Sequence, residues 1–231
     1  MTDLDFSLIS LAKFLNSTPS EKKTLIQGQL SFDPDRPFHY QAAKWPIIKY
    51  ILAGGNQSIL DNGIKRIKNK IPDTDWKKRD NKYSIEALEL FKSMPLPPFV
   101  KNFRLEYIET KANFLPIHGI NIKVSPNSIF RIEYEGQKYI GAFKIHIAKK
   151  DPFNNQQSAL VAQLLNQFLS NFVEKEDEKV DPRLCICIDP FAQTIINASH
   201  KMALDMKQLK LICDEIHQIR NSDSLGNLGV A

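Results

Sequence analysis

The chain has 231 residues, 42% of them hydrophobic and 25% charged, so it can bury a substantial core and has the composition of a globular protein. It contains no apolar run as long as a membrane span, and its first residues lack the basic start of a signal peptide, so we expect a cytoplasmic protein with no membrane partner. The formal net charge of +5 is compatible with an anionic partner but does not demonstrate one.

The first part of the chain carries helical patterns. Apolar residues recur at helical spacing from Leu8 to Leu15, and Thr18-Pro19-Ser20-Glu21 is a capping box that opens a helix running to about Gln29. Further helical patterns follow at 42–52, 58–68 and 84–91, before a proline-rich stretch. We therefore assign residues 1–80 to a helical N-terminal region.

After the proline-rich stretch the apolar period changes from 3.6 to 2, which predicts strands. Alternation occurs at 103–108, 120–124, 129–134 and 139–147. The remaining predicted elements are a long amphipathic helix at 154–172, a solvated charged linker at 174–179, strands at 184–188 and 194–197, and a final helix whose apolar stripe starts at Met202. We assign residues 81–220 to an α/β domain and residues 221–231 to a disordered tail.

Cysteine usage argues against both disulfides and zinc. The chain has three cysteines, of which Cys185 and Cys187 lie in an apolar run that is typical of a buried strand. Their spacing matches no common zinc motif, so we expect buried thiols that bind no metal.

The strands at 129–134 and 139–147 flank a turn and predict a hairpin. Because side chains alternate across a strand, one face of the hairpin is expected to form core and the other to present Asn127, Lys144 and His146. A two-residue turn keeps the polar faces together. Asn127 lies opposite Lys144 if the turn is Glu135-Gly136, and opposite His146 if the turn is Gly136-Gln137.

Pro126-Asn127 opens the first strand of this hairpin, Ala142-Phe143-Lys144 lies on the second, and Gln157 lies on the following helix. Over about residues 84–196 this arrangement resembles the PD-(D/E)XK nuclease superfamily, in which two carboxylates bind Mg²⁺ or Mn²⁺ and a lysine helps to activate the attacking water. The resemblance implies an α+β fold, with a helical N-terminal region, an α-β-β-β-α-β core with a mixed sheet, and a C-terminal helix.

Both carboxylates that the superfamily pattern requires are replaced, one by Asn127 and the other by Ala142. Hard divalent cations need anionic oxygen ligands, so we expect no cofactor, and Mg²⁺ or Mn²⁺ only if another acid has taken over. Glu133 on the same face and Glu106 on an earlier strand are the acids that could do so. The candidate catalytic residues are Lys144, Gln157 and Glu133, and the residues expected to line the site are Asn127, His146 and Glu106.

Each candidate also has a structural explanation. A lysine or histidine on the polar face of a hairpin is most often simply solvated, and Asp189 is expected to form a turn rather than to bind metal. The convergence of Asn127, His146 and Gln157 on Lys144 is what favours a site.

A second feature is a basic stretch between Ile64 and Lys82, interrupted by three aspartates. Basic side chains attract phosphates, and an aromatic ring can stack on an unpaired base. The candidate nucleic-acid contacts are Lys65, Arg66, Lys68, Lys77, Lys78, Arg79 and Trp76. The alternative is a helix and loop whose charges serve solubility alone.

Three functions follow from these features. The first is a nucleic-acid-associated protein, binding DNA or RNA, with a catalytically degenerate nuclease-like domain. The second is an active metal-dependent nuclease with a relocated acid. The third is an interaction scaffold whose N-terminal helices dock a protein partner, without nucleic-acid binding.

Overall fold

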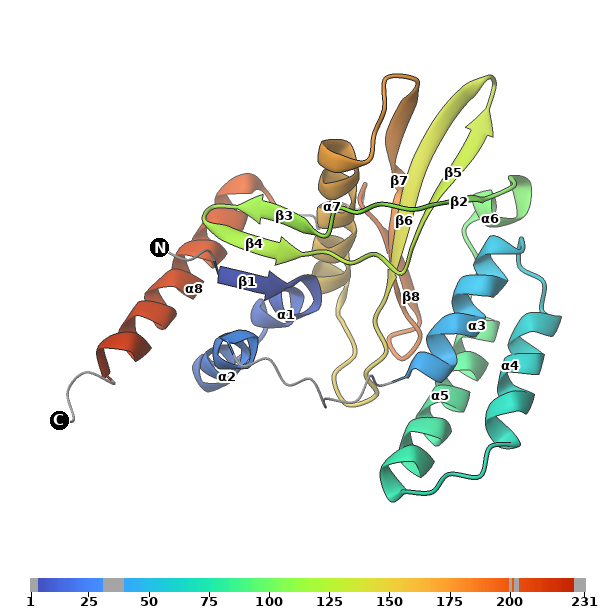
Figure 1. Cartoon of the computed structure of the whole chain (residues 1–231), viewed down its shortest axis with the longest axis horizontal. Coiled ribbons are helices and arrows are strands. Elements are labelled where there is room, and N and C mark those ends of the chain that lie inside the picture. The colour runs from blue at the N-terminus through green and yellow to red at the C-terminus, as the bar shows by residue number, and fades with distance from the viewer. Residues whose placement is uncertain (1–3, 31–39, 200, 202–203, 227–231) are drawn as a thin grey trace.

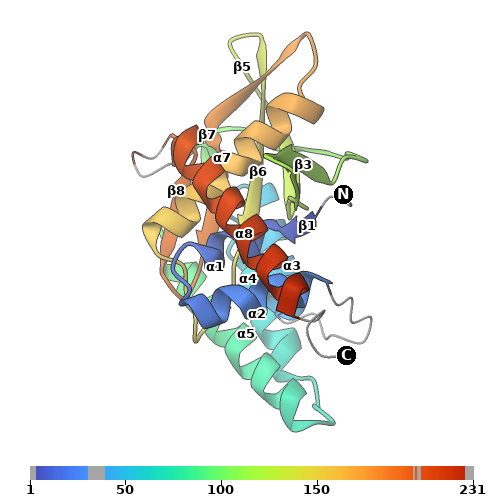
Figure 2. The same ribbon diagram turned by 90° about the vertical axis from the view of Figure 1, so that its left-hand side faces the viewer.

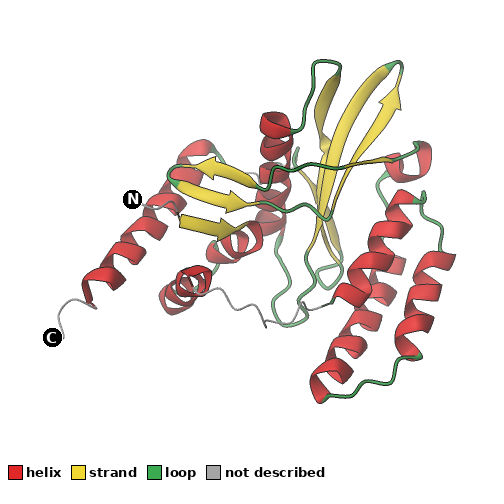
Figure 3. Cartoon of the chain, viewed as in Figure 1, coloured by secondary structure: helices red, strands yellow, loops and turns green. Residues whose placement is uncertain are grey.

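The computed structural model of the protein describes residues 4–30, 40–199, 201 and 204–226. Its helices are α1 (Leu8–Phe14), α2 (Pro19–Leu30), α3 (Gln41–Leu52), α4 (Ser58–Lys68), α5 (Asp75–Ser93), α6 (Pro98–Asn102), α7 (Asn155–Phe172) and α8 (Met206–Gly226). Its strands are β1 (Leu4–Ser7), β2 (Glu106–Ile108), β3 (Phe114–Ile117), β4 (Ile120–Lys123), β5 (Ser128–Tyr134), β6 (Gln137–Ile145), β7 (Glu178–Asp189) and β8 (Thr194–Asn197). The predicted α+β class, with a mixed sheet and a C-terminal helix, is confirmed (Figure 3).

Two sheets organise these elements (Figure 1). The larger sheet has the order β2-β5-β6-β7-β8, and only its β6–β7 pair is parallel, with α7 as the crossover between these two strands. The smaller sheet has the order β1-β4-β3 and contains a hairpin that lies between β2 and β5 in the chain. With that hairpin set aside, the main elements from α5 onward are a helix, three strands, a helix and a strand.

The larger sheet separates two hydrophobic cores. On one face α7 packs together with α1, α2, α8 and the smaller sheet, and on the other face lie α3, α4 and α5 (Figure 1). Alternate side chains enter alternate cores: Ile140 and Ala142 enter the first, and Phe143 and Ile145 enter the second. The continuous apolar run Leu184–Ile188 serves both cores at once, as expected of a strand that is covered on both faces.

The β5–β6 hairpin has the first of the two predicted turns. Tyr134 pairs with Gln137, so the turn is Glu135-Gly136, and both turn residues have positive φ, 51° and 76°. This is the conformation of a type I′ turn, whose twist matches that of the strands, and glycine at the second position adopts it without strain. The register then brings Ser128 opposite Phe143 and places Asn127 at the level of Lys144.

The face of this hairpin that was expected to present polar side chains also forms part of a core. Ile129, Ile140 and Ala142 lie on the same face as Asn127 and Lys144, and all three are buried in the core beneath α7. The apolar residues on the face that was expected to be polar are the reason, because they bury surface only if a helix covers them.

Two segments predicted as loop or helix form strands. The charged linker expected at 174–179 ends early, because β7 begins at Glu178, whose buried carboxylate accepts hydrogen bonds from Arg131 on β5. Residues 4–7 form β1 by pairing with β4, a partner more than a hundred residues away. Neither partner is visible from local periodicity.

The predicted boundaries also change. Within the described part of residues 1–80, α1 and α2 join the core on one side of the sheet while α3 and α4 join the core on the other. The helix α8 continues to Gly226, into the segment predicted to be disordered, while 227–231 and Met202 lie outside the described residues. Figure 2 shows α8 crossing the molecule near α2, where Lys22 pairs with Glu215.

None of the helices in the described part of the chain is long and apolar enough to cross a membrane.

Candidate functional site

Three of the predicted site residues, Asn127, Lys144 and His146, lie at one end of the larger sheet. Asn127 precedes β5, and its side-chain Oδ1 accepts a hydrogen bond of 2.7 Å from the backbone N–H of Ile145. Its own N–H donates to the carbonyl of Phe143. The amide side chain therefore extends the pairing of the two strands by one step beyond the regular ladder.

Lys144 directs its ammonium group at backbone carbonyls. Its Nζ donates to the carbonyl oxygens of Val124, at 3.2 Å, and of Ser125. Burial, together with the positive charge of Lys44, lowers the pKa of Lys144 to about 8. The lysine of the nuclease pattern thus has neutral oxygen partners where that pattern would supply carboxylates.

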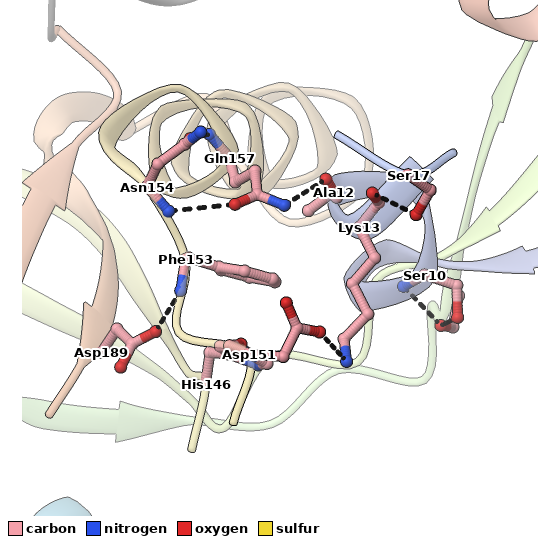
Figure 4. Close-up of polar contacts among 11 residues, drawn as sticks. Ser10, Ala12, Lys13, Ser17, His146, Asp151, Phe153, Asn154, Gln157 and Asp189 are labelled. Atoms are coloured by element: carbon pink, nitrogen blue, oxygen red, sulfur yellow. Dashed lines mark hydrogen bonds and ion pairs between the residues drawn. The ribbon is translucent and has the colours of Figure 1, made fainter. Parts of the chain in front are cut away.

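His146 is buried against Phe153, with the two rings stacked 3.6 Å apart between centroids (Figure 4). Its Nε2 lies 3.0 Å from the carbonyl oxygen of Asp151, so this nitrogen carries the proton and donates. Burial lowers the pKa of His146 to about 4, against the opposing effect of the Asp151 carbonyl. The neighbouring Lys13 pairs with the Asp151 carboxylate at 2.5 Å.

Asp189 forms the turn that was expected of it. Its carboxylate accepts hydrogen bonds from the backbone N–H groups of Phe153, Phe191 and Ala192. Burial raises the pKa of Asp189, although these three donors oppose the rise. The carboxylate thereby ties the loop before α7 to the end of β7.

Gln157 has structural partners at both ends of its side chain. Its Oε1 accepts from the N–H of Asn154 at 3.0 Å, while the Asn154 side chain accepts from the N–H of Gln157, which makes a reciprocal capping box at the start of α7. Its Nε2 donates to the carbonyl of Ala12 at the end of α1 (Figure 4). These bonds explain a buried polar group here without a substrate.

The remaining candidates are not brought to Lys144. Glu133 is exposed and pairs in register with Lys138, six residues along β6 from Lys144 or about 20 Å at strand spacing. Glu106 lies on the edge strand β2 with its carboxylate 3.8 Å from Arg131. Across the residues that the structure describes, no group of three or more His, Cys, Asp and Glu side chains is placed to hold a metal ion.

A second region, helices α3–α5, carries the net positive charge of the protein. We call residues 41–93 the basic helical unit. It contains eleven lysines and arginines and six acids, a net charge of +5, whereas the rest of the chain contains twenty of each. The excess positive charge of the whole molecule is therefore the charge of this one unit.

The predicted nucleic-acid contacts lie on this unit, and their charges are not equivalent. Lys77 pairs with Asp73 at 2.8 Å and Lys78 with Asp75 at 3.1 Å, so both are partly neutralised. Trp76 is half-buried. The exposed basic residues that make no ion pair within the described part of the chain include Lys65, Arg66, Lys68 and Arg79.

Sequence reasoning missed one feature of the basic helical unit, a hollow of about 560 Å³ between α3 and α4. We call it the α3–α4 hollow. Trp45 at its edge is 57% exposed, on the opposite side of α3 from buried Ala43, Ile47 and Ile51. The sequence signal that could have revealed this hollow is a tryptophan outside the apolar stripe of an amphipathic helix. The hollow is lined by Trp45, Pro46, Lys49, Ile59, Asn62, Gly63 and Arg66.

No protein-family model matches the chain, and no curated protein sequence matches it at a significant level.

Proposed function

We propose that the protein binds nucleic acid, DNA or RNA, through the basic helical unit, and that its nuclease-like sheet is a scaffold without metal-dependent cleavage. The observation that carries the proposal is the location of charge: the entire net charge of +5 belongs to residues 41–93. A phosphate backbone is attracted by such a local excess of cations, whereas cations spread among acids attract it weakly.

The scaffold role is supported by the residue at the position of the missing acid. Ala142 is fully buried in the core with Ile129, Ile140 and Cys185, so the core occupies the space that an acid would need. A carboxylate there would lose its hydration inside an apolar core, which is costly. We therefore propose that the protein resembles the superfamily in ancestry and shape but does not cleave nucleic acid.

We place this activity in the cytoplasm. The three cysteines are unpaired and buried, and burial raises the pKa of Cys185 and Cys187 to about 12. Unpaired thiols persist in a reducing compartment, which supports this location.

The test is fluorescence anisotropy with labelled DNA and RNA over a salt series. The variant Lys65→Glu/Arg66→Glu/Lys68→Glu should lose most of the affinity, and its slope of log affinity against log salt should be shallower by about one for each phosphate contact removed. The matched control, Lys175→Glu/Lys179→Glu/Lys207→Glu, changes net charge equally at exposed sites outside the unit and should retain most of the affinity.

Two results would contradict the proposal. Absence of binding even at low salt would favour a scaffold for a protein partner. Cleavage with Mg²⁺ or Mn²⁺ that Lys144→Ala and Glu133→Ala both abolish would show an active nuclease with a relocated acid.

A further inference from the structure

The α3–α4 hollow is built by two rows of side chains at helical spacing. Trp45 and Lys49 are four residues apart on α3, and Asn62 and Arg66 are four residues apart on α4, so each pair shares a face. All four side chains are exposed. One aromatic ring, one amide and two cations therefore surround a single depression.

The floor of the hollow depends on a close approach of the two helices. A Cβ added to Gly63 would lie 2.7 Å from Cγ of Pro46, so only glycine permits this contact. Gly63, Pro46 and the half-buried Ile59 make an apolar floor beneath the polar rim. The hollow thus combines an apolar floor with a rim of polar and charged side chains.

The side chains of this hollow match the chemistry of an unpaired nucleotide. An exposed indole offers a face on which any base can stack, and the flanking cations attract the phosphates on either side of it. A base inside a duplex is covered by its neighbours and cannot reach the indole face. A site of this chemistry would therefore favour single strands over duplexes.

We infer that the α3–α4 hollow binds an unpaired nucleobase, stacked on Trp45, with the adjoining phosphates held by Lys49 and Arg66. The inference rests on the proposed function and makes it more specific, because it assigns single-stranded nucleic acid as the preferred ligand. The exposed cations elsewhere on the basic helical unit then attract single strands and duplexes alike.

The test uses Trp45 as its own reporter. The chain has two tryptophans, so the emission of Trp45 is the difference between the wild-type protein and Trp45→Ala. An oligothymidylate of about 15 nucleotides should quench that emission on binding. Trp45→Ala should weaken single-strand binding by about 5- to 100-fold, whereas binding of a duplex of equal length should change by less than about twofold.

Trp45 is exposed, so the fold should survive its removal, and Trp45→Phe should restore most of the affinity because a ring remains. Lys49→Ala should reduce the salt slope for the single strand by about one.

The possible failures are distinguishable. If wild-type protein binds neither form, the proposed function and this inference both fail. If it binds both forms equally and Trp45→Ala has no effect, only this inference fails. Quenching by a polyglutamate peptide as strong as that by the oligonucleotide would overturn the assignment of a nucleobase.

Discussion

The ammonium group of Lys144 is held by backbone carbonyls in a largely buried position, and its protonation there is linked to stability. Burial lowers its pKa to about 8 in the folded protein, against about 10.4 in an unfolded chain. Between these values the unfolded state binds more protons, so the Lys144 contribution makes the free energy of unfolding rise as pH rises through this window. Below pH 8 the folded protein carries the full cost of a buried charge.

We therefore expect Lys144→Met to gain stability relative to wild type at pH 7 and to lose most of that gain by pH 10. Between pH 7 and pH 10 the difference in the free energy of unfolding between variant and wild type should change by about 2 kcal/mol, a figure discounted for the partial exposure of the side chain. Urea denaturation at both pH values measures it, with Lys101→Met as an exposed control. A stability difference that does not change with pH would contradict the assigned environment of Lys144.

At the scale of single residues, the sequence predicted which side chains share a strand face better than it predicted the hydrogen bonds that those side chains make. The alternation of side chains correctly placed Asn127 and Lys144 on one face of the hairpin, but it left Lys144 or His146 as the residue opposite Asn127, and the observed turn selects Lys144. It did not reveal that Gln157 would bond to Ala12, a partner 145 residues away. Long-range hydrogen bonds of this kind leave no periodic signal in the sequence.

Among the elements, the junction of β6 and β7 shows how one glycine fixes a strand pairing. The register shifts between Ile140 and Ala142, and a Cβ added to Gly141 would lie 2.4 Å from Cβ of Leu184 and 2.6 Å from its carbonyl oxygen. Gly141 therefore permits the close passage of β7 at the irregularity, where a side chain would force the two central strands apart.

Gly141→Ala should lower the free energy of unfolding by about 2–3 kcal/mol or more, because neither strand can move away without disturbing the cores on both faces. Gly28→Ala in α2 is the matched control, since nothing lies within 4 Å of its added Cβ and alanine is the better helix former. Thermal or urea unfolding should show opposite signs for the two variants. Equal tolerance of both would contradict the packing around Gly141.

The elements that the sequence predicted well are those whose apolar pattern is long and local. The helix at 154–172 and the hairpin at 129–147 are found within a few residues of their predicted limits. The short strands β1 and β3 were not predicted; each pairs with β4, which lies between them, and β1 is far from this partner in the sequence. At its early start β7 pairs with β6 through Glu178 and Lys138, and Glu178 forms an ion pair with Arg131 on β5.

For the molecule as a whole, the larger sheet needs both of its covering layers. Leu8, Leu11 and Phe14 of the first helix are fully buried in the core that also contains Val161 and Leu165 of α7. Residues 43–67 contribute in the same way to the core on the other face.

A fragment of residues 81–231 should therefore fail to form a native domain, although it contains most of the larger sheet. We expect a fragment that aggregates or lacks near-ultraviolet circular dichroism, because apolar surface on both faces of the sheet is left in water. Mixing the fragment with a separately produced 1–80 peptide should not give two independently folded domains. A cooperative, native-like unfolding transition of the fragment alone would show that the N-terminal region is dispensable.

The pairing of β1 with β4 also constrains when this protein can finish folding during its synthesis. Residues 4–7 leave the ribosome before their hydrogen-bonding partners, residues 120–123, so more than a hundred further residues must be made before β1 has a neighbour. At about 5–20 residues per second this delay is on the order of ten seconds. Throughout it, an unpaired apolar strand is open to chaperones and to the nascent chains of nearby ribosomes.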